Sequence, residues 1–187
     1  MHPEGRRGDR GAPPEEERLT LFRSGPFSQW HPAPFVLDGT PYPTAEHAMM
    51  AARAALFGDA EARAAILAAP TPRVAKALGR AVRGYDDAAW RAVARDVAYR
   101  ANRAKFEARA ALRAALLATA GTTLVEASPS DTVWGIGLAA DHPDALDRAR
   151  WRGTNWLGDA LTRVRDDLLA AAAARRAALD PPARDGL

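Results

Sequence analysis

Cysteine is absent from the 187-residue chain, which excludes disulfide bonds, thiolate nucleophiles and cysteine ligands to metals. A chain without cysteine fits most simply in a reducing cytoplasm. Long apolar runs are absent too. None approaches the roughly 18–20 residues that a membrane-spanning helix needs, and the N-terminal stretch lacks the apolar core of a signal peptide. We therefore expect a cytoplasmic protein with no membrane partner.

The chain also has little excess charge of either sign. Its formal net charge is only +3 at pH 7, which gives weak support for nucleic acid as a partner. Familiar signatures are missing: there is no Walker loop, no G-x-G-x-x-G after a strand and no G-x-S-x-G. His47 and His142 are far apart, and H-E-x-x-H is absent. We expect a chemistry that needs no metal and no cofactor.

Alanine is abundant, and the hydrophobic fraction of 48% fits one globular domain built from closely packed helices. Capping signals mark the helix starts: Thr44 and Thr71 each precede an apolar pattern, and Pro72 takes a first helical position. Gly58 ends the first helix. The predicted helices cover residues 45–57, 59–69, 71–82, 86–120 with a break near 107–110, and 155–179.

Three short segments predict strands. Asp38-Gly39 between apolar runs indicates a hairpin over 34–42, and the segments 122–128 and 133–139 predict two more strands. The expected fold class is α+β, mainly α, as a single domain whose small β-sheet comes from 34–42 and 122–138. The predicted division is a disordered leader over 1–18, the domain over 19–170, and a helix end with a flexible tail over 171–187.

Lysine is rare: of 26 basic residues only Lys76 and Lys105 are lysines. Where arginine serves almost everywhere else, a lysine suggests a need for an amine that can lose its proton, and chance is an equally good explanation for either one alone. Lys105 borders the packed side of the long helix. The apolar face of that helix is formed by Trp90, Val93, Ala94, Val97, Ala101 and Ala104.

Several polar residues stand at element boundaries, and each has an ordinary structural explanation. The dipole of a helix favours a carboxylate such as Glu46 in the first turn. Asp131 suits an Asx-turn, and Asn155 suits a helix N-cap. Taken together, carboxylates, an amine and aromatic rings suit a planar base attached to a sugar. An acid can protonate the leaving nitrogen, or a neutral lysine can attack the anomeric carbon and form a Schiff base.

Four segments give this pattern a specific context: PFSQWHPAPFVLDGTPYPTAEHAM, TPRVAKALGR, RAKFEARAALRAALLATAGTTLVEASPSDTVWGIG and GTNWLGDALTRVRDDL. In order and spacing they resemble the NADAR/YbiA family, from about Phe22 to Leu169. The resemblance implies a YbiA-like helical domain and a metal-independent N-glycosidase. Some family members act on early riboflavin-pathway intermediates, which carry ribose 5-phosphate on an aminopyrimidine, and others remove ADP-ribose from guanine bases in nucleic acid such as DNA.

The resemblance also implies roles for single residues. Glu46 becomes the principal catalytic acid or base, Lys105 the candidate for a Schiff-base intermediate, and Asp131 a catalytic or sugar-orienting carboxylate. The implied substrate-binding residues are Phe27, Trp30, His47, Arg80, Trp90, Trp134, Gly135 and Asn155. Among these, the guanidinium of Arg80 suits a phosphate.

Two segments depart from the family pattern. Residues 27–30 read Phe-Ser-Gln-Trp where members commonly have F-S-N-F, and residues 48–52 read Ala-Met-Met-Ala-Ala where aromatic and glutamine residues are usual. We expect these positions to line the base pocket. They also motivate a second hypothesis, a non-catalytic sensor that binds ADP-ribose or a similar nucleotide. A third is a structural partner protein that associates through its C-terminal helix; the sequence leaves the oligomeric state open.

Overall fold

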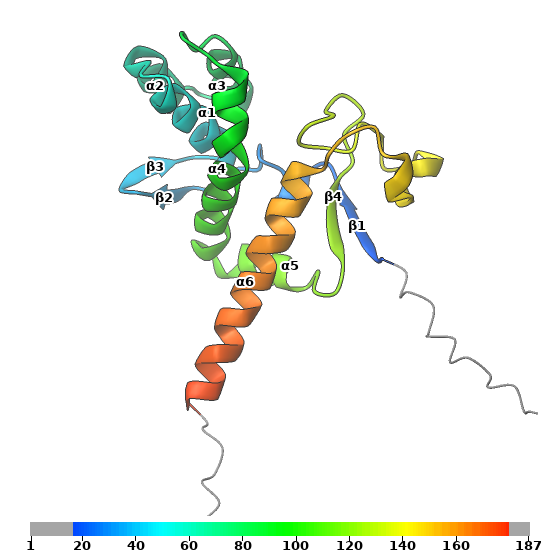
Figure 1. The fold of residues 1–187 in the computed structure, drawn as a ribbon. Coiled ribbons are helices and arrows are strands. Elements are labelled where there is room, and N and C mark those ends of the chain that lie inside the picture. Colours follow the sequence, from blue (N-terminus) through cyan, green and yellow to red (C-terminus); the bar gives the residue numbers. More distant parts are fainter. Residues whose placement is uncertain (1–16, 180–187) are drawn as a thin grey trace, which may run out of the picture.

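Helices make up most of the chain that the computed structural model describes, residues 17–179 (Figure 1). The predicted leader, apart from its last two residues, and the end of the predicted tail lie outside this range. The helices are α1 (Ala45–Leu56), α2 (Ala60–Leu67), α3 (Pro72–Arg80), α4 (Asp87–Glu107), α5 (Ala110–Leu117) and α6 (Trp156–Leu179). The prediction of a mainly helical single domain is confirmed.

The helix starts follow the capping signals. The Thr44 hydroxyl accepts from the backbone N–H of His47, and the Thr71 hydroxyl accepts from that of Val74. Asp86 caps α4 in the same way. Each cap satisfies one of the backbone donors that a helix start leaves free. The predicted break near 107–110 is confirmed, because α4 ends at Glu107 and α5 begins at Ala110.

The strands form two separate two-stranded sheets rather than the single expected one. Strand β2 (Phe35–Leu37) pairs antiparallel with β3 (Thr40–Tyr42) around the predicted turn, where Asp38 and Gly39 have φ values of 49° and 75°. Strand β4 (Thr123–Glu126) instead pairs parallel with β1 (Leu19–Phe22), which was not predicted. Strands β2 and β3 pair only with each other, and β4 pairs with the strand that precedes them in the chain.

The prediction of a strand over 133–139 is wrong. The segment turns back behind β4: the N–H of Ile136 donates to the carbonyl of Glu126, and that of Gly137 to the carbonyl of Asp131. Gly137 has a φ of 70°, which lies outside the extended region. Glycine therefore permits a compact loop in an apolar sequence that otherwise favours a strand.

Three hydrophobic clusters stabilise the described part of the domain, and the two larger ones meet at one tryptophan. The first surrounds α1, which packs on α2, α3 and α4, and the second joins α6 to β4 and to the end of α4. Figure 1 shows α1, α2, α3 and the hairpin on one side of the molecule, and α6 with β1 and β4 on the other. Trp134 packs against both clusters. None of the helices within residues 17–179 is long and apolar enough to cross a membrane.

Candidate functional site

A cleft of about 1020 Å³ opens where the two halves meet, and we call it the central cleft. Its walls come from the loop after β1, from α1, α3 and the start of α4, and from the loop after β4. Its acidic residues are Glu46, Asp87, Glu126 and Asp131, and its cations are Arg23, Arg53, Arg73, Lys76, Arg80 and Arg91. Its aromatic residues are Trp30, Tyr85, Trp90, Trp134 and Trp156.

Glu46 lies in the first turn of α1 and is only 5% exposed. Burial raises its pKa above the ordinary value, and the charge of Asp131 adds to the rise. The charges of Lys76 and Arg80 act in the opposite direction, as does the Trp30 side chain. A buried carboxyl group with a raised pKa holds its proton more readily than an exposed one, which suits an acid or a base in a cleft.

Asp131 faces the same cleft from the loop after β4. Its Oδ1 accepts hydrogen bonds from the backbone N–H groups of Val133 at 3.0 Å and Trp134 at 2.7 Å. This is the Asx-turn expected from the sequence. The carboxylate therefore also fixes the backbone at Trp134, in the wall of the cleft.

Glu126 is a cleft residue that sequence analysis missed. It is the last residue of β4, and its Oε2 is buried without a hydrogen-bond partner among the described residues. The pKa of Glu126 is raised to about 7: burial is the main cause, the charge of Asp131 adds to the rise, and the charges of Arg23 and Lys76 oppose it. The available signal was its position, a carboxylate directly after an apolar strand and within the LVEASPSD motif.

The two lysines lie in different environments. Lys105 is fully buried, and its Nζ donates a 2.8 Å hydrogen bond to the carbonyl of Ser28. Burial lowers the pKa of Lys105 to about 7. It does not line the central cleft, although Ser28 does. Lys76 lines the cleft, and its charge acts on both Glu46 and Glu126. The lysine directly exposed to a ligand in this cleft is therefore Lys76.

Four of the expected binding residues line the cleft: Trp30, Arg80, Trp90 and Trp134. The Trp30 ring has the Nζ of Lys76 at 5.9 Å from its centroid. At 37% exposed, this ring is free to stack on a flat ligand. These residues thus provide flat apolar surfaces beside positive charge, as a phosphorylated base requires.

Two expected binding residues lie in the hydrophobic interior instead. Phe27 packs with its ring centroid 5.6 Å from Phe22 and 6.3 Å from Phe106. His47 is fully buried: its Nε2–H donates to the carbonyl of Ala69 at 3.1 Å, and its Nδ1 lies 2.7 Å from the Thr44 hydroxyl. Neither lines the central cleft.

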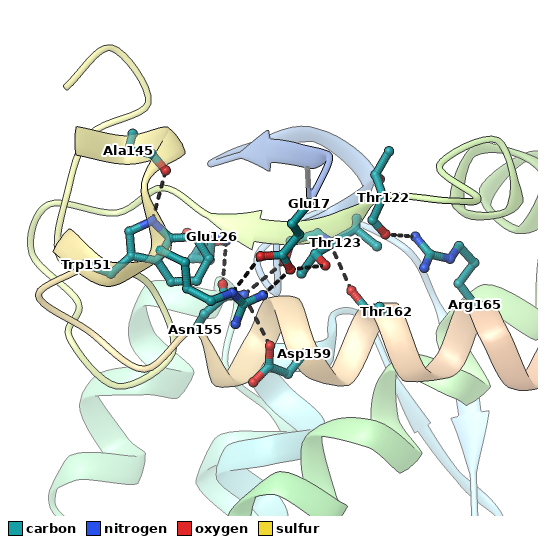
Figure 2. A network of polar contacts seen from close by, with 12 residues as sticks. Glu17, Thr122, Thr123, Glu126, Ala145, Trp151, Asn155, Asp159, Thr162 and Arg165 are labelled. Atoms are coloured by element: carbon teal, nitrogen blue, oxygen red, sulfur yellow. Dashed lines mark hydrogen bonds and ion pairs between the residues drawn. The ribbon is translucent and has the colours of Figure 1, made fainter. Parts of the chain in front are cut away.

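Gly135 and Asn155 lie behind β4 rather than in the cleft. Figure 2 shows the Asn155 side chain directed at this strand: its Oδ1 accepts from the backbone N–H of Glu126 at 3.0 Å, and its Nδ2 donates to the carbonyl of Leu124 at 3.0 Å. A Cβ at Gly135 would lie 2.8 Å from the carbonyl oxygen of Glu126. Both residues therefore hold Glu126 in place.

The second departure from the family pattern, residues 48–52, falls on two faces of α1. Met49 and Met50 line the central cleft, and the Gln29 Nε2 donates to the Met49 Sδ at 2.6 Å. The Oε1 of Gln29 is buried without a partner among the described residues. The alanines of the segment line a second pocket, of about 290 Å³, on the other face: Ala48, Ala51 and Ala52. Only part of the altered segment therefore faces the cleft.

Within the described part of the chain, no three histidine, aspartate or glutamate side chains gather where they could hold a metal ion. The cleft contains no histidine ligand pair, and its carboxyl groups are spread over α1, β4 and the following loop.

Comparison with known proteins places these features in a family. A model of the NADAR domain matches residues 19–169. An N-glycosidase of Acanthamoeba polyphaga mimivirus is 39% identical over 146 residues, which cover 75% of this chain and 86% of the viral protein. The N-glycosidase YbiA of Escherichia coli is 36% identical over 144 residues, covering 77% and 81%.

The fold is similar as well. The NMR structure of YbiA from Escherichia coli superposes with a TM-score of 0.69 at 31% sequence identity, covering 92% of this chain and 94% of the other. Both the sequence match and the structural match span nearly all of the helical domain described above. The chain belongs to the NADAR domain family.

Proposed function

We propose that the protein is an N-glycosidase that hydrolyses the bond between the anomeric carbon and the base nitrogen of a phosphorylated ribosyl base, such as an early riboflavin-pathway intermediate. The observation that carries this proposal is the meeting of Glu46, Glu126 and Asp131 with Lys76 in one cleft. The names of the relatives support the reaction type.

The chemistry of the bond matches this set of groups. A base nitrogen leaves poorly as an anion, so a carboxylic acid that protonates it lowers the barrier. The sugar develops positive charge at its anomeric carbon, and a carboxylate nearby stabilises that charge. We assign Glu46 to acid or base catalysis and Asp131 to the sugar.

The remaining cleft residues suit the rest of such a substrate. Trp30 offers an exposed face on which a base can stack, and Arg80 offers a guanidinium that can bind phosphate through two hydrogen bonds. The unpartnered Oε1 of Gln29 offers an acceptor to an amino group of the base.

An amine route is the alternative to direct attack by water. Lys105, implied by the family resemblance, has a pKa lowered to about 7 but is enclosed behind Ser28, whereas Lys76 borders the cleft. If either amine attacks the anomeric carbon, the opened sugar forms a Schiff base. Borohydride would reduce it to a stable adduct, and peptide mapping would assign the adduct to Lys76 or Lys105.

A larger substrate is a second candidate, namely ADP-ribose attached to a guanine base in DNA. The specific observation in its favour is the cleft volume of about 1020 Å³, which lies at the upper end of the roughly 300–1,000 Å³ typical of ligand sites. A DNA substrate would show steep salt dependence and require the base to leave the stack. A small metabolite would show neither.

The test is incubation with both substrates, the ribosylaminopyrimidine phosphate and ADP-ribosylated guanine in DNA, with release of base or sugar followed by mass spectrometry. We expect release from one of them. The Glu46→Gln variant should reduce the rate at least about 100-fold, the usual scale of a lost acid or base. A folded protein that releases nothing but binds ADP-ribose in calorimetry would contradict the proposal and favour the sensor hypothesis.

A further inference from the structure

Glu126 is a further carboxyl group in the central cleft, and neither the family resemblance nor the proposed roles of Glu46 and Asp131 account for it. Its Oε2 is buried and has no partner among the described residues. A buried polar atom without a partner costs free energy. One that lines a ligand cleft is therefore a strong candidate to bond the ligand.

The surroundings of Glu126 hold it firmly. The side chain of Asn155, directly before α6, accepts a hydrogen bond from the backbone N–H of Glu126. Because Gly135 has no side chain, the loop after β4 can lie directly against the backbone of Glu126. The network around Asn155 in Figure 2 shows how the strand and α6 are joined at this point. A catalytic group benefits from such support because a proton must be delivered at a defined distance and angle.

The charges that face Glu126 come from three elements. Asp131, in the loop after β4, disfavours a second negative charge, and Arg23, after β1, and Lys76, on α3, favour it. Burial and Asp131 prevail, and the pKa of Glu126 rises to about 7. A pKa of about 7 leaves a fraction of the Glu126 side chains protonated at neutral pH, in a residue that lines the cleft.

We propose that Glu126 is the catalytic acid that protonates the leaving base, distinct from Glu46. The inference rests on the proposed N-glycosidase function and names a residue for one of its steps. The Glu126 carboxyl gives its proton to the base nitrogen, and the electron pair of the breaking bond goes to that nitrogen. Water adds its oxygen to the anomeric carbon and gives its proton to the Glu46 carboxylate, which the charges of Lys76 and Arg80 favour. Proton exchange with solvent restores both groups.

The experiment compares leaving groups in wild type and Glu126→Gln. One substrate is the ribosylaminopyrimidine phosphate, and the other is ribose 5-phosphate carrying p-nitrophenol, which departs without protonation. Glu126→Gln should lower kcat/KM for the natural base at least about 100-fold and change it little for p-nitrophenol. Glu46→Gln should impair both, since water attack is common to them. The exposed Glu107→Gln is the matched control and should change neither.

Two readouts separate a catalytic role from a structural one. In wild type, kcat/KM should fall as pH rises through about 7, and this limb should be missing in Glu126→Gln. Infrared difference spectra should show a carboxyl band titrating in the same range, absent in the variant, with or without substrate. Equal losses for the two leaving groups, or an unchanged alkaline limb, would overturn the assignment while leaving the glycosidase intact. If folded wild type turned over neither the ribosylaminopyrimidine phosphate nor ADP-ribosylated guanine in DNA, both the assignment of Glu126 and the proposed glycosidase function would be overturned.

Discussion

At the scale of single residues, Glu46 and Glu126 share a raised pKa but differ in the charges around them. Burial is the main cause for both. The strongest charge on Glu46 is the cation of Lys76, whereas the strongest on Glu126 is the anion of Asp131. The cleft therefore gives one carboxyl group a counterion and the other a repelling neighbour. Such a difference is how two chemically identical acids acquire separate roles.

Lys105 gives a stability prediction at the same scale. Its pKa is about 7 in the folded protein and about 10.4 in an unfolded chain. Between these values the unfolded state binds more protons, so the free energy of unfolding rises with pH, by up to about 1.4 kcal/mol per pH unit from this group. In Lys105→Met this contribution should vanish, and the variant should exceed wild type in stability most clearly near pH 7. Urea denaturation at pH 7, 8.5 and 10 measures the difference.

Lys105→Arg is the matched variant, because a guanidinium stays charged at all these pH values. It should be less stable than wild type and should not recover as pH rises. Equal pH slopes in wild type and Lys105→Met would contradict the burial of an ionisable amine at this position.

At the scale of elements, the start of α6 is attached to β4 by side-chain hydrogen bonds. Asn155 has a φ of 54° and bonds two backbone groups of the strand, and the Thr162 hydroxyl accepts from the N–H of Leu124 at 3.0 Å. β1 covers the other edge of β4. The helix thus supplies the bonds that a third strand would otherwise make.

Asn155→Ala should therefore destabilise the protein, because it leaves the N–H of Glu126 and the carbonyl of Leu124 without partners. Each buried unsatisfied group costs about 1–3 kcal/mol, so for the two groups we expect a loss of roughly 2–6 kcal/mol in the free energy of unfolding. Denaturant titration followed by circular dichroism measures it. Thr154→Ala, which removes an exposed hydrogen bond to Val133, is the neighbouring control and should stay within about 0.5 kcal/mol of wild type. A similar small effect for Asn155→Ala would contradict its anchoring role.

The sequence predicted helices and strands well where the residues that determine them lie close together in the chain. The predicted caps Thr44 and Thr71 begin helices because the capping group and its partner are three residues apart. The pairing of β1 with β4 depends on residues far apart in the chain, and no capping or turn signal encodes it. Asn155 looked like an ordinary N-cap for the same reason, since its true partners are on the distant strand.

At the scale of the whole molecule, the cleft draws on segments from Arg23 to Leu157. The polar residues at element boundaries were recognisable in the sequence, and the structure brings Glu46, Asp131, Trp30 and Trp134 together in the cleft. The different exposure of Lys76 and Lys105 was not predictable, because it depends on the loop that covers Lys105 through Ser28. The role of Glu126 was not predictable either, because the pKa of a carboxyl group at a strand end depends on charges from distant parts of the chain.

The C-terminal part of α6 gives a prediction at this scale. Leu168 is the last buried residue of the helix, and Leu179 is 87% exposed. Removing residues 170–187 should keep glycosidase activity and change the free energy of unfolding by no more than about 0.5 kcal/mol. We expect the same oligomeric state in light scattering with and without this segment. A drop in mass on truncation would instead support an assembly role for the alanine-rich helix end.

The parallel pair β1–β4 has a consequence for how the protein is made. Leu19 is opposite Thr123 in the register, so β1 can pair only after a strand that follows roughly a hundred residues later has been translated. Closing so long a loop is slow compared with forming the intervening helices. On the ribosome, α1 to α3 can therefore assemble early, whereas the half of the cleft that holds Glu126 forms only after β4 has been translated. A stalled or truncated chain would carry Glu46 in an open helical subdomain without its opposing acids.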